Sequence, residues 1–244
     1  MAAPSTPQEP LTPMAAIHDT TMSPTKLELL TTWLPTRPWY RDTGTPAQLA
    51  KVGGFRLDDP DGEVGIEFMV VADRSAPRTA IYHVPMTYRA GPLTGADDAL
   101  IGTSEHGVLG RRWIYDGTRD PVFVAQLLAL LHGAATPQAQ SRSDTPDPSV
   151  HVVPVPGNPG TVTGSSASDD PTATELRVSV ATPAQESVGA LVVRVVRQPV
   201  DDGSDSAGSD QGCVRAPWRT GDGTASRGVL VTALRIGEPL STAS

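Results

Sequence analysis

The chain has little of what several classes of protein require. It holds one cysteine, Cys213, so it cannot form a disulfide within itself. No apolar run approaches the roughly 18 residues of a membrane-spanning helix. The first 22 residues lack the basic and apolar regions of a signal peptide. We therefore expect a cytoplasmic protein that does not enter a membrane.

Basic residues are also scarce. The chain has 19 Lys and Arg against 27 Asp and Glu, which gives a formal net charge of −8, and Lys26 and Lys51 are its only lysines. A nucleic-acid-binding protein needs a basic surface that displaces counterions from the phosphates. The sequence therefore argues against a nucleic-acid partner.

The residues of a phosphoryl-transfer centre are missing as well. Neither lysine follows a glycine, so no glycine-rich phosphate loop ending in Lys is present. A kinase-like centre also needs an asparagine that helps to hold magnesium. The only asparagine, Asn158, lies in a turn-like segment rich in Gly and Pro. We expect a protein that is not an enzyme, has no catalytic residues and binds no cofactor.

Metal-binding patterns are weak. The five histidines do not occur at the spacings of a zinc site, and no nucleophile-elbow motif is present. Asp58, Asp59, Asp61 and Glu63 offer the oxygen ligands that calcium prefers. The alternative is a turn that binds its own carboxylates locally, which we favour because Pro60 and Gly62 are typical turn residues. No metal site is predicted.

Turn-forming residues, in contrast, are abundant. Gly and Pro supply 47 of 244 residues, and hydrophobic residues only 38%, which predicts long irregular stretches. We expect a disordered tail over 1–22. A linker with one possible short strand is expected over 135–172, and a small β-rich unit over 173–238 that contains a disordered acidic loop, 201–211.

Between the tail and the linker, the pattern indicates a folded domain over 23–134. Leucines recur at helical spacing over 24–34, with Ser23 as the expected N-cap, and a second helix is expected from Asp120 to Gly133. Three strands are expected between these helices, with a bulge or a sharp bend at Gly53-Gly54 in the first. Pro85, in the third, indicates an edge position or a bulge. We predict an α+β fold, in which a small antiparallel sheet carries two packed helices.

Aromatic residues are few, and five of the eleven fall in two short segments. Aromatic side chains beside arginines favour protein interfaces and sugar stacking. One interpretation is therefore a ligand or partner surface, and the other is that these residues form the core of the domain. The residues concerned are Trp33, Trp39, Tyr40, Arg111, Arg112, Trp113 and Tyr115.

The order of these segments resembles the N-terminal cap of maltokinases. The segment Trp33–Tyr40, the strand-like runs 64–71 and 82–89, and the segment 110–117 carry the resemblance, which covers about 22–134. It implies an α+β unit that packs beside a kinase-like body, which phosphorylates maltose with ATP. The ATP- and sugar-binding residues of the family belong to that body, and we expect none of them here.

The chain also resembles stand-alone cap-like proteins that are labelled glucan-branching proteins. That label fits poorly, because a branching enzyme needs a barrel of about 250 residues with paired carboxylates. We expect a non-catalytic interaction or regulatory module of glycogen, maltose or trehalose metabolism, whose partner is a sugar kinase or a glucan-metabolising enzyme. The alternatives are a maltokinase-related kinase activity or subunit, and an oligosaccharide-binding sensor.

Overall fold

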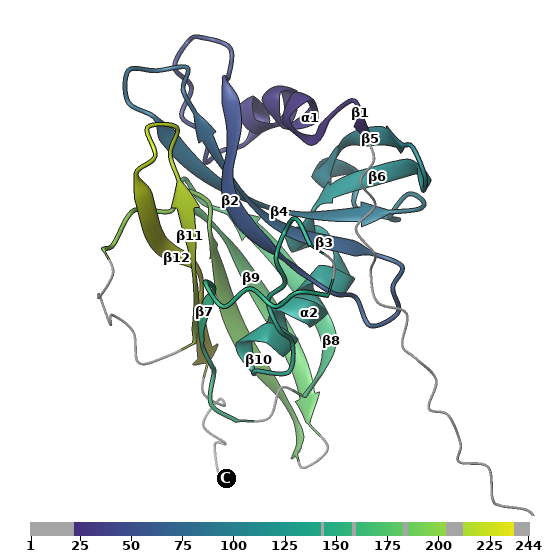
Figure 1. Ribbon diagram of the computed structural model, residues 1–244. Helices are drawn as coiled ribbons and strands as arrows, with labels where there is room; N and C mark the ends of the chain where they lie inside the picture. Colours follow the sequence, from purple (N-terminus) through teal and green to yellow (C-terminus); the bar gives the residue numbers. More distant parts are fainter. Residues whose placement is uncertain (1–21, 143, 158–159, 183–184, 204–211, 237–244) are drawn as a thin grey trace, which may run out of the picture.

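The computed structural model describes residues 22–142, 144–157, 160–182, 185–203 and 212–236 (Figure 1). The predicted disorder of the tail and of the acidic loop falls mostly on residues 1–21 and 204–211, outside this part. The helical elements are α1 (Lys26–Trp33), α2 (Pro121–Leu131) and the 3-10 turns η1 (Leu34–Thr36), η2 (Asp97–Ala99) and η3 (Gly117–Arg119). The strands are β1 (Met22–Ser23), β2 (Leu49–Leu57), β3 (Gly65–Asp73), β4 (Ala80–Arg89), β5 (Leu100–His106), β6 (Gly110–Asp116), β7 (His151–Val153), β8 (Thr161–Asp169), β9 (Ala173–Thr182), β10 (Gln185–Val196), β11 (Cys213–Arg219) and β12 (Ala225–Ile236).

The prediction of an α+β fold with a small sheet is wrong, because the chain is mostly β. Strands make up 47% and helices 14% of it, and the described strands join in one antiparallel sheet. Its order is β1-β5-β6-β4-β3-β2-β11-β12-β10-β9-β8, with β7 beside β11. β8 was predicted to be part of a linker, because its Ser, Thr and Gly residues do not alternate with apolar residues. Pairing with a neighbouring strand, rather than local sequence, places them in the sheet.

The two halves of the sheet meet at the predicted bulge or bend in β2. The register of β2 against β3 shifts between Lys51 and Gly53, so the strand is irregular where a bulge or a bend was predicted. Gly53 pairs with Trp218 of β11, and a Cβ atom on Gly53 would lie 2.7 Å from the Pro217 carbonyl oxygen. The glycine therefore allows the backbone of β11 to approach β2 closely.

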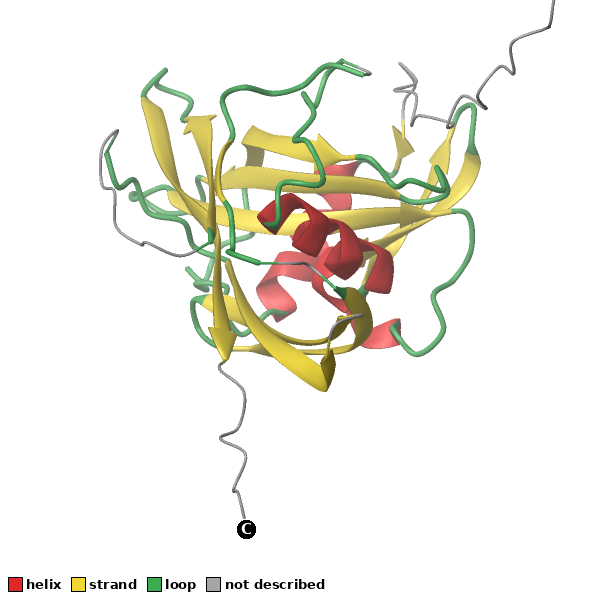
Figure 2. Cartoon of the chain, turned by 90° about the horizontal axis from the view of Figure 1, so that it is seen from below, coloured by secondary structure: helices red, strands yellow, loops and turns green. Residues whose placement is uncertain are grey.

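A second contact joins the halves on the other side. The backbone N–H of His83 in β4 donates to the carbonyl oxygen of Arg197, just after β10, at 2.9 Å. The sheet thus curls until the end of β10 reaches β4, and Figure 2 shows strands on both sides of a central helix. Pro85 of β4 has no backbone N–H to donate to a neighbouring strand. This is tolerated because β6 pairs with β4 only from Met86 onward, so no hydrogen bond to β6 is lost at Pro85.

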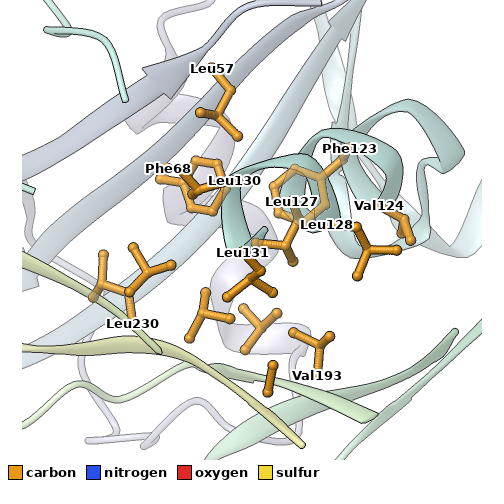
Figure 3. Close-up of a cluster of buried hydrophobic side chains, with 14 of the residues drawn as sticks. Leu57, Phe68, Phe123, Val124, Leu127, Leu128, Leu130, Leu131, Val193 and Leu230 are labelled. Atoms are coloured by element: carbon orange, nitrogen blue, oxygen red, sulfur yellow. The ribbon is translucent and has the colours of Figure 1, made fainter. Parts of the chain in front are cut away.

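Helix α2 fills the space inside the curled sheet. The sequence prediction of this helix is confirmed, and Asp120 caps it by accepting from the Val122 N–H at 2.9 Å. Gln126 is the only polar side chain between Pro121 and Leu131. A helix that is apolar on all sides must be buried on all sides. Its leucines and Phe123 pack against residues of β2 and β3 and also against β9 to β12 (Figure 3).

Helix α1 covers the opposite face of the same sheet. Met69 and Val71 of β3 pack beneath it, whereas Phe68 and Val70 face α2. Both faces of β3 are therefore buried. The N-cap of α1 is Thr25 rather than the predicted Ser23, because Thr25 forms a capping box with Glu28.

Shortening one α2 side chain tests how much of the fold depends on this helix. Leu127 is buried in the shared core, so Leu127→Ala is expected to lower the free energy of unfolding by about 2 to 5 kcal/mol. Urea unfolding of the full chain measures this. Gln126→Ala, on the same helix, is the control and should change it by less than about 0.5 kcal/mol. Equal effects of the two substitutions would contradict the enclosed position of α2.

Candidate functional site

The first predicted aromatic group lies in the core between α1 and the sheet. Trp33 and Trp39 are buried, with ring centroids 5.9 Å apart, and Tyr40 stacks on Tyr82 at 5.4 Å. The Tyr40 hydroxyl donates to Asp73 at 2.9 Å. Partial burial, together with this carboxylate, raises the pKa of Tyr40 to about 12. These aromatic rings stabilise the packing of α1 and of the segment that follows it.

The second aromatic group lies in a different cluster. Tyr115 is buried against Ala96 and Ala99, and its hydroxyl accepts from the Leu93 N–H at 2.9 Å. Trp113 is half-buried on the same cluster. The structure therefore separates Trp113 and Tyr115 from the first group, instead of uniting all five aromatic side chains in one patch.

The loop between β5 and β6 presents two apolar side chains to solvent. Val108 is 59% and Leu109 is 44% exposed. The Nδ1 atom of His106 accepts from the backbone N–H groups of both residues, at 3.3 and 3.2 Å. Arg112 donates to the Leu109 carbonyl oxygen at 3.0 Å. The loop is thus held in one conformation that keeps the apolar pair outside the core.

Two of the predicted surface residues, Arg111 and Arg112, follow this loop at the start of β6. Arg111 is exposed, and its guanidinium lies 5.6 Å from the centre of the Trp113 ring. We call Val108, Leu109, Arg111, Arg112 and Trp113 the hairpin surface. Val108 and Leu109 were not among the predicted surface residues. Their position between Gly107 and Gly110, in a turn where polar residues are usual, is a signal in the sequence that could have indicated them.

A buried carboxylate joins α1 to β2 and β3. Glu67 accepts from Lys26 at 2.6 Å, Tyr88 at 2.6 Å, Gln140 at 3.0 Å and Lys51 at 3.4 Å. Burial opposes ionisation, but the two lysine charges and the hydrogen bonds lower the pKa of Glu67 to about 2. Both lysines of this arginine-rich chain thus serve one carboxylate. This network fixes the helix on the sheet.

A second buried network lies where β4 meets the end of β10. The guanidinium of Arg197 is fully buried, is paired with Asp116, and donates to Thr174 at 2.7 Å and to Thr118 at 3.1 Å. It also lies 4.8 Å from the centre of the Trp39 ring. Asp116 and Trp39 come from the first half of the chain and Arg197 from the second. The network therefore ties the halves together by a paired charge.

His83 belongs to the same region. Its ring stacks on Phe68, and its Nδ1 lies 3.0 Å from the Val196 carbonyl oxygen, which can only accept, so Nδ1 carries the proton. Burial, and then the charge of Arg197, lower the pKa of His83 to about 3. The ring is consequently neutral at neutral pH and acts as a fixed hydrogen-bond donor to β10.

The acidic turn at 58–63 is held by hydrogen bonds from its own backbone. Asp59 is buried and accepts from the backbone N–H groups of Asp61, Glu63 and Val64. Asp59 thus stabilises the turn locally, which agrees with the interpretation favoured from the sequence for this carboxylate. Among the described residues, no group of three or more His, Cys, Asp or Glu side chains is arranged to hold a metal ion.

The neutral His83 makes stability depend on pH. The unfolded chain protonates this ring below pH 6.5, but the folded chain does so only near pH 3. Acid therefore favours unfolding, and the free energy of unfolding should fall between these values by up to about 1.4 kcal/mol per pH unit from this residue.

Urea unfolding at several pH values between 6.5 and 4.5 measures this slope. His83→Gln keeps a hydrogen-bond donor but cannot titrate, so its slope should be smaller by that amount. The matched control is His151→Gln, at an exposed position. If His83→Gln and the wild type show the same slope, the neutral buried ring is refuted.

Comparison with known proteins finds one family model that matches part of the chain. No helix in the described part of the chain has the length and apolar character needed to cross a membrane. A search of curated proteins finds no match. Residues 33–120 match the model of the maltokinase N-terminal cap domain, which here runs from the end of α1 to the N-cap of α2. This part of the chain is therefore similar to the N-terminal cap domain of maltokinases, and we call it the cap-like domain.

Proposed function

We propose that the chain is a non-catalytic cap module that binds another protein of carbohydrate metabolism. The partner is a sugar kinase or a glucan-metabolising enzyme of glycogen, maltose or trehalose metabolism. Support comes from the cap-like domain at 33–120. The resemblance to maltokinases implies that such a domain lies beside a catalytic body and does not itself hold the nucleotide.

The polar groups of the chain support a non-catalytic role. Glu67, His83 and Asp116 have the burial that activates catalytic groups in enzymes. Each of them, however, is engaged by side chains or backbone of this chain that hold α1 or the curled sheet in place. These interactions account for the perturbed pKa values of Glu67 and His83 without a substrate.

The hairpin surface carries the proposal. Val108 and Leu109 are exposed, and a partner that covers them would gain about 25 cal/mol of binding free energy for each Å² of apolar surface removed from water. Because His106 and Arg112 already fix the loop, little conformational entropy is lost on binding. Arginine and tryptophan are the side chains that most often dominate binding energy in interfaces. A matching partner surface has an apolar pocket with carboxylates at its rim.

Neither alternative function has an observation in its favour. An oligosaccharide sensor needs aromatic faces that a sugar can reach, but Trp33, Trp39 and Tyr115 are buried. Tyr40 and Trp113 are half-buried and belong to different clusters, so they do not form one stacking platform. A kinase needs an asparagine or an equivalent ligand for magnesium, and Asn158 is the only asparagine in the sequence.

Affinity capture with the full chain tests the proposal. The chain is used as bait in a lysate of the cells that produce it, and bound proteins are identified by mass spectrometry. A sugar kinase or glucan-metabolising enzyme should be enriched. The double substitution Val108→Asp and Leu109→Asp should reduce this enrichment about tenfold or more, because carboxylates replace the apolar contact.

Val200→Asp is the matched control, since Val200 is 76% exposed and lies outside the hairpin surface. Its enrichment should equal that of the wild type. The purified chain is also incubated with ATP, magnesium and maltose, and no phosphate transfer above the blank is expected. Robust turnover, or capture without any carbohydrate-metabolism protein, would refute the proposed function.

A further inference from the structure

We propose that β8 is the dimerisation edge of this protein, where it pairs antiparallel with β8 of a second copy. The two sheets then join in one continuous sheet across a two-fold axis. This proposal concerns a part of the chain outside the cap-like domain and does not depend on the proposed function.

The position of β8 supplies the hydrogen-bonding groups. Within the described residues, β8 is the last strand of the sheet and pairs only with β9 (Figure 1). It is nine residues long, and most of them are exposed. An edge strand of this length presents a row of backbone N–H and C=O groups that match another edge strand.

The composition of β8 leaves this edge open. Natural edge strands are usually blocked by a lysine, a proline, an inward-pointing charge, a β-bulge or extreme shortness. The register of β8 against β9 shifts between Val162 and Gly164, so the regular part of this edge runs from Gly164 to Asp169. Residues 161–168 contain no charged residue and no proline, and their side chains are small or β-branched. The opposite end of the sheet differs, because β5 is contacted there by β1 and by the segment of α1. Ser104 donates to the Pro24 carbonyl oxygen at 2.7 Å, and a Cβ atom on Gly102 would lie 2.7 Å from Leu29.

A second copy is the occupant that fits this strand. A two-fold axis pairs a strand with itself, so like charges must not meet across it. The one charged residue is Asp169, which lies opposite Thr161 or Thr163 when the axis passes through Ser165 or Ser166. An interacting peptide would need complementary charges or apolar side chains, for which 161–168 offers only Val162 and Ala167 as partners.

Net charge sets how the dimer responds to salt. Each chain carries a formal charge of −8, so two copies repel each other over long distances. Salt screens this repulsion and leaves short backbone hydrogen bonds almost unchanged. Association should therefore strengthen as the salt concentration rises, in contrast to an interface held together by ion pairs.

Light scattering coupled to size-exclusion chromatography measures the mass of the full chain from about 1 to 500 µM, which spans the affinities of small interfaces. We expect the mass to rise from 25.5 kDa toward twice that value. Hydrogen exchange followed by mass spectrometry should show protection of 161–169 that grows with concentration. A single mass of 25.5 kDa throughout the series would overturn the proposal.

Two variants with the same added charge separate β8 from other surfaces. Ser166→Asp places two carboxylates across the two-fold axis and should keep the chain monomeric. It should still fold, because the cross-strand neighbour of Ser166 is the exposed Arg177. Thr94→Asp, in an exposed loop, should dimerise as the wild type does. A dimer that Ser166→Asp leaves intact would assign the interface to another face and refute the proposal.

Discussion

The fold depends on the enclosure of one short apolar helix. Helix α2 has no polar face, so it is stable only where apolar side chains surround it. The strands of the cap-like domain cover one part of it, and β9 to β12 cover the rest. Burial of its leucines and Phe123 thus links two parts of the chain that a family boundary at residue 120 separates. The cap-like domain and the C-terminal strands share one core.

The two buried charge networks make this arrangement specific. Hydrophobic burial has no direction, and it would allow the strands to slide against α2. Glu67 can satisfy its four donors only with α1, β2 and β3 in register. Arg197 reaches Asp116 only when the end of β10 meets β4. Breaking either network would leave an unpaired buried charge, which costs several kcal/mol.

The two proposed contact regions lie outside the buried polar networks. Buried side chains with perturbed pKa values serve the packing, whereas Val108 and Leu109 of the hairpin surface are exposed and β8 pairs only with β9 among the described strands. They lie in different parts of the sheet, since seven strands lie between β6 and β8 in its order. A cap module that dimerises through β8 would therefore keep both of its hairpin surfaces available.

The sequence by itself determined the elements whose signals are local. The apolar stripe and Asp120 specified α2, the glycine pair specified the irregularity in β2, and the ordered segments specified the cap-like domain. Only the tertiary structure decided the rest. Whether Trp39 lies at a surface or in a core, and whether β8 is a strand, depend on segments far away in the sequence. Trp39 packs against Arg197 and β8 pairs with β9, and such contacts leave no periodic pattern in either partner.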